Sequence, residues 1–468
     1  MNNKSRFKLF FFAVIAEMDL AVINLINAFF IGRGLGTDGE TAYELIIPCV
    51  FLISAVVAMC YNGTQAICSK DYGAGNEEDF NNHKNAGYSW TIFSVALISV
   101  IFIIFRSFIL DFLGAYDAGK VVAKYCEDGY DMFIPSFVSG SFFCIVSCLM
   151  FLEEKKQLLI SNIILYSIFM GGNIIVSNVK PSMKGYIGVH LISILAADIY
   201  IIMYFFSRKG TSKAAFTRFN LKFRDIKEIL LTGMADFFEY GFAAIAIIIE
   251  NGYLLSRFKA SFVAGLGTFE AVENITELIC VGFCFLVTAS LGIRIGKVIK
   301  AITPEEELSA NKELTKEANS LTKFALIGGL VISAIFVISA NLIVKIFYAD
   351  KIESSVESVI VWLIRSYAVG FILYLINSEI VCYYKLVEAI PQAHIIYLSE
   401  ALIFPVICKI GLGELFGIYG FCVGGALTEL LTFIINICLV WHANGKIPLH
   451  IQDFRLDKYL IELKKGNG

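Results

Sequence analysis

Charged residues are scarce in this chain. They make up 17% of its 468 residues, whereas a soluble protein of this length carries about 25%. The longest polar segments, 207–228 and 294–323, are too short to bury a core of their own. This shortage of charge excludes an ordinary soluble globular protein and leaves no room for a separate soluble domain.

Catalytic and nucleotide-binding motifs are also missing. The sequence contains no HExxH, phosphate-binding GxxxxGK[ST], GxSxG or CxxCH motif. Its five histidines are scattered, and its twelve cysteines show neither a CxxC pair nor zinc spacing. Most cysteines lie in apolar runs, where they behave as small hydrophobic residues. We therefore predict that the chain is not an enzyme, has no cofactor and no nucleic-acid partner, and has no certain metal site, with a coupling Na⁺ or H⁺ left open.

Apolar runs, by contrast, recur along the whole chain, and 57% of its residues are hydrophobic. A helix that spans a bilayer needs about 20 mostly apolar residues. The sequence predicts an all-α integral membrane protein with twelve transmembrane helices. The predicted spans are 8–31, 41–68, 85–113, 121–152, 157–178, 185–207, 226–255, 261–293, 319–349, 356–384, 390–411 and 415–442.

The distribution of positive charge predicts the orientation. With the N-terminus in the cytoplasm, 26 of the 38 Lys and Arg residues fall in cytoplasmic segments. Cytoplasmic loops of membrane proteins carry such an excess. The first apolar run begins near Phe7 and lacks a small-residue cleavage site, so we interpret it as a span rather than a signal peptide. We therefore predict a multi-pass protein of the plasma membrane with both termini in the cytoplasm.

An internal repeat divides the chain into two halves. The segment Asn27–Arg33 resembles Asn251–Arg257, and Gly185–Gly188 resembles Gly417–Gly420. Parallel repeats of this kind build two-lobed transporters. The predicted domains are an N-terminal lobe at 1–207, a basic linker at 208–225, and a C-terminal lobe with its tail at 226–468. An ordinary basic loop is the alternative reading of the linker.

Three segments resemble the multidrug and toxic compound extrusion (MATE) family, in its bacterial-type branch. Asn27–Gly36 resembles the end of that family's helix 1, and Gly63–Asn76 is similar to its helix 2 and the loop that follows. Gly417–Glu429 resembles the opening of its helix 12. The resemblance implies two six-helix lobes around a central cavity that opens alternately to either side. It also implies a monomer in a lipid bilayer that exchanges Na⁺ or H⁺ for small organic, often cationic, compounds.

The sequence departs from the family at two positions in the first lobe. Many members carry Asp where this chain has Asn27, and an Asn-x-x-x-Asp motif in helix 5 where it has Asn173 and Ser177. Asn and Ser side chains do not exchange a proton near neutral pH. A proton switch of the family's type is therefore not expected at these positions.

Ionisable residues inside spans suggest function, because burying them in lipid is costly. The acidic residues singled out inside spans number five in the first half and nine in the second, which favours the second lobe for coupling. The candidates for cation coupling or substrate binding are Glu239, Glu273, Glu277, Glu379, Asp236 and Asp198. Glu239 is the first choice, because it resembles a Glu that some family members carry in helix 7. Protonation and Na⁺ binding are both open there, and so is a solvated position without function.

The other candidates carry alternatives of their own. Glu273 and Glu277, with Glu270, share one face of a helix, which predicts either a cation pathway or a wet vestibule. Three readings are open for Glu379: a functional acid, an ion pair with Arg365, or a hydrogen bond between helices. Asp198 lies two turns from His190, and the pair predicts either a proton relay or packing.

Two other functions remain open. One is a flippase for lipid-linked oligosaccharides. It is disfavoured because Arg106 and Arg365 are the only arginines within the predicted spans and acids outnumber them. The other is a non-transporting membrane receptor, which the substitutions at Asn27 and Ser177 leave open.

Overall fold

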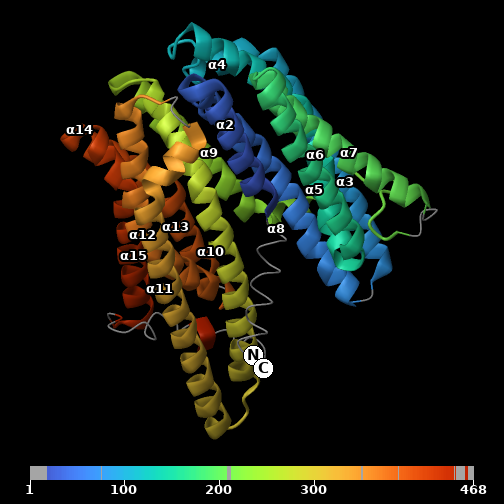
Figure 1. Cartoon of the computed structure of the whole chain (residues 1–468). Helices are drawn as coiled ribbons and strands as arrows, with labels where there is room; N and C mark the ends of the chain where they lie inside the picture. Colours follow the sequence, from blue (N-terminus) through green and yellow to red (C-terminus); the bar gives the residue numbers. More distant parts are fainter. Residues whose placement is uncertain are drawn as a thin grey trace. The chain divides into compact units, whose positions relative to one another are not determined.

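The computed structural model describes residues 18–74, 76–207, 212–348, 352–387, 389–446, 448 and 459–461, which form helices and no strand. This confirms the all-α class. Residues 8–17 of the first predicted span and 208–211 of the predicted linker lie outside the described residues. The elements are α2 (Met18–Ala74), α3 (Glu77–Ile104), α4 (Arg106–Phe112), α5 (Lys120–Glu153), α6 (Lys155–Val179), α7 (Met183–Ser207), α8 (Phe223–Thr232), α9 (Met234–Arg257), α10 (Ser261–Lys300), α11 (Pro304–Tyr348), α12 (Ser354–Leu386), α13 (Ile390–Leu398), η1 (Ser399–Ile403), α14 (Phe404–Phe416) and α15 (Ile418–Asn444) (Figure 1).

The helix count agrees with twelve spans. Eleven helices in the described residues are long and apolar enough to cross a membrane. One of them, α2, has 57 residues and changes direction at Gly36, where φ is 73° and ψ is −159°. A straight helix of that length would be about 85 Å long, far more than the roughly 30 Å of a bilayer core. α2 therefore contains the first two predicted spans, and Gly36 lies in the break predicted between them.

Backbone contact explains one interruption that the sequence did not predict. The predicted span 226–255 is divided into α8 and α9 at Gly233. A Cβ atom on Gly233 would lie 2.0 Å from the carbonyl oxygen of Met59. One turn before Gly233, the carbonyl oxygen of Ile229 lies 2.2 Å from where a Cβ on Gly63 would be. The two glycines let the backbones of α2 and the α8–α9 junction touch.

The polar segment 294–323 is helical on either side of a break at 301–303, which falls in the predicted gap between two spans, but both helices reach further into this segment than the predicted spans do. The Thr303 hydroxyl accepts a hydrogen bond from the Glu306 N–H at 3.2 Å, and the Glu306 carboxylate accepts one from the Thr303 N–H at 3.2 Å. This reciprocal pair is a capping box that starts α11 at Pro304. Glu313 on α11 then pairs with Arg294 and, at 2.9 Å, with Lys297 on α10. Both helices therefore continue beyond the apolar spans.

The chain forms two compact units, one of residues 26–267 and one of residues 268–468 together with those up to Leu25. In the 26–267 unit, α7 packs against α5 and α6, and α3 packs against α5 and α8. In the 268–468 unit, α12 packs against α11 and α15, and α14 packs against α15. The units end at other residues than the predicted lobes 1–207 and 226–468, and the lobe boundaries stay a prediction.

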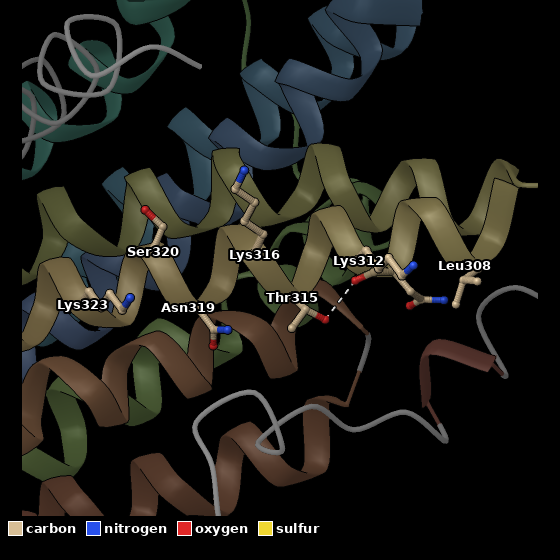
Figure 2. A pocket seen from close by; sticks show the side chains of 8 residues that line it. Leu308, Lys312, Thr315, Lys316, Asn319, Ser320 and Lys323 are labelled. Atoms are coloured by element: carbon tan, nitrogen blue, oxygen red, sulfur yellow. Dashed lines mark hydrogen bonds between the residues drawn. The ribbon is translucent and has the colours of Figure 1, made fainter. Parts of the chain in front are cut away.

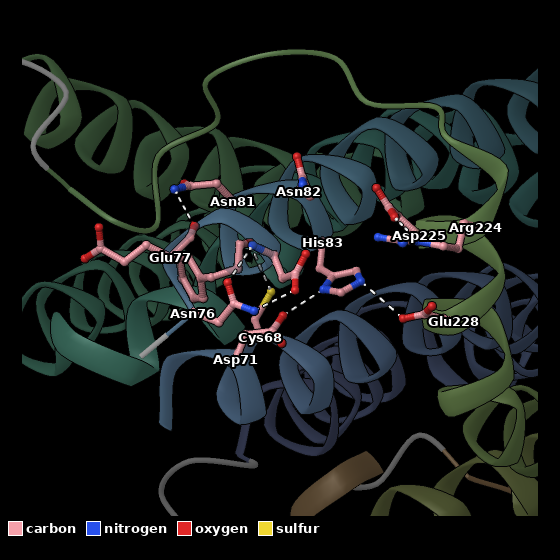
Figure 3. A network of polar contacts seen from close by, with 12 residues as sticks. Cys68, Asp71, Asn76, Glu77, Asn81, Asn82, His83, Arg224, Asp225 and Glu228 are labelled. Carbon is pink, nitrogen blue, oxygen red and sulfur yellow. Dashed lines mark hydrogen bonds and ion pairs between the residues drawn. The ribbon is translucent and has the colours of Figure 1, made fainter. Parts of the chain in front are cut away.

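A polar network holds the connection between α2 and α3 in the 26–267 unit (Figure 3). The His83 ring lies 2.7 Å from an Asp71 oxygen and 3.3 Å from a Glu228 oxygen on α8. Asn76 caps α3 by accepting a hydrogen bond from the Asp79 N–H at 3.4 Å. The loop that resembles the family motif therefore joins three helices.

Apolar side chains cover much of the surface. Ile338, Phe206 and Leu415 are 81%, 78% and 74% exposed, and each lies on a candidate spanning helix. Water would disfavour so much exposed apolar surface, whereas lipid tails solvate it. The chain is a multi-pass membrane protein.

Candidate cation and substrate site

Glu379 is the most enclosed of the predicted acids in the 268–468 unit. It lies on α12 and is 7% exposed. Its Oε1 atom accepts a hydrogen bond from the Thr322 hydroxyl of α11 at 2.9 Å, and its Oε2 atom has no partner among the described residues. Arg365 instead donates to the carbonyl oxygen of Val337 at 3.3 Å. Of the three predicted readings, the pair with Arg365 is therefore wrong, and one carboxylate oxygen remains available to a proton or cation.

A second buried acid, Glu429 of α15, lies in a side-chain network. The Asn377 amide of α12 donates to both the Glu429 carbonyl oxygen and its Oε2 atom, each at 3.1 Å. Asn436 donates in turn to the Asn377 oxygen at 3.1 Å. This chain of amides fixes Glu429 between two helices, as expected of a group that specifies packing.

The acidic face of α10 becomes more exposed along the helix. Glu270 and Glu273 are half-buried, and Glu277 is exposed. Thr276, on the next face, shares a hydrogen bond of 3.0 Å with the Tyr367 hydroxyl of α12. Three carboxylates at this spacing agree with the predicted polar face, and a role in cation binding stays a prediction.

The first-choice residue, Glu239, is exposed, and Asp236 one turn before it is half-buried. Both lie on α9 and belong to the 26–267 unit, whereas Glu273, Glu277 and Glu379 belong to the other unit. Sodium binding near Glu239 stays a prediction. Within the described residues, no group of three or more His, Cys, Asp or Glu residues is placed to hold a metal ion.

Asp198 does not bond with His190. Asp198 is 6% exposed and accepts a hydrogen bond from the Ser139 hydroxyl of α5 at 2.6 Å. The His190 ring lies 5.4 Å from the Phe169 ring, and neither of its nitrogens has a hydrogen-bond partner in the described part of the chain. The contacts of Asp198 therefore match the packing alternative, and a role in coupling stays a prediction.

Each of the two substituted family positions forms a hydrogen bond with a tyrosine hydroxyl. Asn27 pairs with a tyrosine of its own helix, α2, and Ser177 of α6 pairs with one on α7. Asn27 is 1% exposed and donates a long hydrogen bond of 3.4 Å to the Tyr43 hydroxyl. Ser177 shares a hydrogen bond of 3.1 Å with the Tyr186 hydroxyl. Asn173 is fully buried and donates to the Phe169 carbonyl of its own helix at 2.8 Å. The structure thus gathers neutral polar groups here.

Tyr186 is the link between the α2 and α6 segments. Its ring stacks on Phe30 at 6.5 Å. A Cβ on Gly34 would lie 2.0 Å from the Tyr186 hydroxyl. Gly34, within the family-like segment, therefore makes room for the tyrosine that holds Ser177.

Sequence reasoning missed Glu40. This residue was assigned to the polar break before the second span, yet it is 0% exposed in the structure. Neither carboxylate oxygen has a hydrogen-bond partner among the described residues. Its i, i+3 and i, i+4 spacing to Tyr43 and Glu44 was the available signal, because that spacing gives the three residues one face of α2.

A groove of about 600 Å³ lies along the first half of α11 (Figure 2). Lys312, Lys316 and Lys323 are exposed along it, and in the described residues none of them pairs with a carboxylate. The charge of this groove suits anions, so it is not a candidate site for an organic cation.

Comparison with known proteins relates this chain to a transporter family. A family model described as MatE matches residues 13–179. The chain carries a MatE domain. Asn27, Glu40, Asn173 and Ser177 lie within this domain, whereas Glu379 lies beyond its matched residues. No curated protein matches the chain in sequence.

Solved structures show that the whole chain has the MATE transporter fold. One is a multidrug resistance MATE family transporter of the MOP superfamily in an inward-facing conformation. It has a TM-score of 0.81 and 14% identity, over 98% of this chain and 99% of that one. An outward-facing structure has a TM-score of 0.71 and 14% identity, over 92% and 93% of the chains. A third is a MOP superfamily transporter from Pyrococcus furiosus, described as having a binding pocket of reversed polarity. It has a TM-score of 0.68 and 15% identity, over 92% of this chain and 94% of that one.

Proposed function

We propose that the chain is a secondary transporter that exchanges Na⁺ or H⁺ for a small organic compound, preferably a cation, by alternating access. The observation that carries the proposal is the fold over the whole chain, since proteins of this fold have been solved inward-facing and outward-facing. It acts as a monomer in the plasma membrane, with both termini in the cytoplasm. No catalytic step is involved.

Acids on the spanning helices α10 and α12 support a cationic substrate or coupling ion. Glu379 presents one carboxylate oxygen without a hydrogen-bond partner among the described residues. Glu277 is exposed on the acidic face of α10. Carboxylate oxygens are suitable ligands for hard cations and attract organic cations in a medium of low dielectric constant.

The test is transport of ethidium, a fluorescent organic cation, by the purified chain in proteoliposomes under an imposed H⁺ or Na⁺ gradient. We expect gradient-driven flux in the wild type and its loss in Glu379→Gln and in Glu239→Gln. Glu357→Gln is the matched control, because Glu357 lies at the start of α12 and contributes to none of these sites. It should transport like the wild type.

The wild type also decides between the alternatives. Absence of gradient-dependent flux for ethidium and other organic cations would contradict cation antiport. Movement of a lipid-linked oligosaccharide would then indicate a flippase, and saturable ligand binding without flux would indicate a receptor.

A further inference from the structure

Residues 40–44 of α2 form a seam with α9 and the start of α10, all within the 26–267 unit. The Thr41 hydroxyl donates to the Ala260 carbonyl at 3.2 Å. The Asn251 amide donates to the Glu44 carbonyl at 3.3 Å. A Cβ on Gly267 would lie 2.9 Å from a Glu44 carboxylate oxygen, so the seam is closely packed. We call this contact the 40–44 seam.

The seam is one end of a longer helix contact. Gly233 approaches Met59, and the Tyr240 ring lies 6.0 Å from the Phe51 ring. Asn251 then contacts Glu44. Residue numbers rise along α9 as they fall along α2, so the two helices run antiparallel. α9 and the turn at Ala260 therefore close over residues 40–44.

Glu40 is a buried residue of the α2 segment that forms this seam. It is 0% exposed, and Tyr43 beside it is 4% exposed. Neither Glu40 oxygen accepts a hydrogen bond, and no cationic side chain pairs with it among the described residues. An ionised carboxylate buried without a partner is strongly disfavoured, and such a group becomes neutral instead. Glu40 therefore carries a proton while the seam is closed.

The seam can separate at modest cost. Among the described residues, the Thr41 hydroxyl and the Asn251 amide donate across it, and Asn251 donates both to the Glu44 carbonyl and, at 3.5 Å, to a Glu44 carboxylate oxygen. A bond of this kind contributes about 1 kcal/mol net between neutral groups and about 2 kcal/mol when one group is charged, because water replaces it when the contact opens. A carboxylic acid that reaches water ionises at neutral pH. Opening would therefore change the protonation state of Glu40.

We propose that Glu40 is a proton-exchanging group of the 26–267 unit, which holds its proton while the 40–44 seam is closed and releases it when the seam opens. The carboxyl O–H bond breaks, and the proton passes to a water molecule that enters the seam. The proposal rests on the proposed function, since alternating access is the movement that would open the seam. Asn27, which contacts Tyr43, cannot exchange a proton itself.

Other ionisable groups are carried by the elements that pack around the seam, and the test must separate them from Glu40. They are Tyr43 and Glu44 on α2, Cys126 on α5, whose thiol donates to the Ala42 carbonyl, Glu250 and Arg257 on α9, and Lys259 in the turn before α10.

The first test is infrared difference spectroscopy on the full-length protein in lipid, recorded as the pH is raised and without substrate. Each carboxyl group that loses its proton also loses a carbonyl band. We expect Glu40→Gln to lack one of the wild-type bands and Glu40→Asp to shift it. The matched control Glu127→Gln should keep it, because Glu127 is half-buried on α5 and pairs with exposed Lys124 at 3.7 Å. Identical spectra for Glu40→Gln and the wild type would overturn the proposal.

A cross-link tests the link to opening. Thr41→Cys and Ala260→Cys are joined by a short bifunctional reagent, in a protein whose exposed Cys438 is replaced by Ser. We expect the Glu40 band change to disappear on cross-linking and to return when a cleavable linker is cut. A band change that persists in the cross-linked protein would show that Glu40 titrates with the seam closed, and would overturn the proposal.

Ethidium flux separates this proposal from the proposed function. We expect Glu40→Gln to lose H⁺-driven flux and to retain ethidium exchange without a gradient. Unchanged H⁺-driven flux in that variant would overturn the role of Glu40. A wild type with the Glu40 band but no flux would contradict the transporter function and leave proton exchange at Glu40 standing.

Discussion

In the 268–468 unit, Glu379 and Glu429 each accept a hydrogen bond from a neighbouring side chain, whereas Glu40 in the 26–267 unit accepts none from the part of the chain that the structure describes. All three are buried, at 7%, 6% and 0% exposure. A hydrogen bond to a carboxylate favours its charged form and fixes its position. Burial alone therefore does not define the role of an acid. Glu379, with one partnered and one available oxygen, suits a fixed cation site, Glu429 suits helix packing, and the partnerless Glu40 suits proton exchange.

The largest effect is expected from removal of the donor to Glu429. Asn377→Leu should destabilise the protein by about 3 kcal/mol, because it leaves a buried acid without its hydrogen bond. Asn27→Leu, its counterpart in the other unit, should cost about 1 kcal/mol, because Asn27 makes one long bond to a neutral hydroxyl. Unfolding in mixed detergent micelles measures both. Equal losses would remove the contrast between the units.

The stability lost when a closely packed glycine is replaced should be the same in both units. A Cβ on Gly424 would lie 2.4 Å from the Lys409 Cα, and one on Gly233 would lie 2.0 Å from the Met59 oxygen. Gly424→Ala and Gly233→Ala should each destabilise the protein by about 2 kcal/mol through overpacking. The control is Gly425→Ala, where nothing lies within 4 Å. A large loss in one unit alone would mean that packing, rather than acid chemistry, distinguishes the units.

Thr322 sharpens the comparison at Glu379. Thr322→Val preserves shape and removes the only hydrogen-bond donor to Glu379 among the described residues. We expect a loss of about 1 kcal/mol in stability and weaker dependence of ethidium flux on the driving cation. Thermal unfolding and flux, measured on the same preparation, check both. An unchanged cation dependence would contradict a role for this hydrogen bond in positioning the carboxylate.

The smallest effect is expected at Glu40. Glu40→Gln should change stability by no more than about 0.5 kcal/mol, because it replaces a neutral acid of nearly the same shape that has no hydrogen bond to lose. A loss of several kcal/mol would indicate an ionised and paired Glu40. Unfolding in mixed micelles, as for Asn377→Leu, is the measurement.

Composition and hydropathy predicted the membrane class and the spans well, because lipid requires long apolar helices. The break at Gly36 was visible as a glycine-rich run. The break before α11 agrees with the predicted gap between spans, but the helix through 304–318 was not predicted, because it depends on a capping box and on the pairs of Glu313 in polar sequence. The interruption at Gly233 depends on contact with Met59, which no local pattern reveals.

The sequence predicted which acids were candidates but not which residues they contact. Glu379 was found because an acid in an apolar run is conspicuous, but Thr322 could not be named as its partner. Glu40 was missed because it adjoins a polar break, and Glu44, one turn further on, contacts α9 and α10, which are more than 190 residues away in the sequence. Contacts of that range require the fold.

The most direct test of coupled transport is a reversal experiment with ethidium at equal concentration on both sides of a proteoliposome membrane. We expect net ethidium movement opposite to an imposed H⁺ or Na⁺ gradient, and a change of direction when that gradient is inverted. No net movement under either gradient, in either direction, would contradict it.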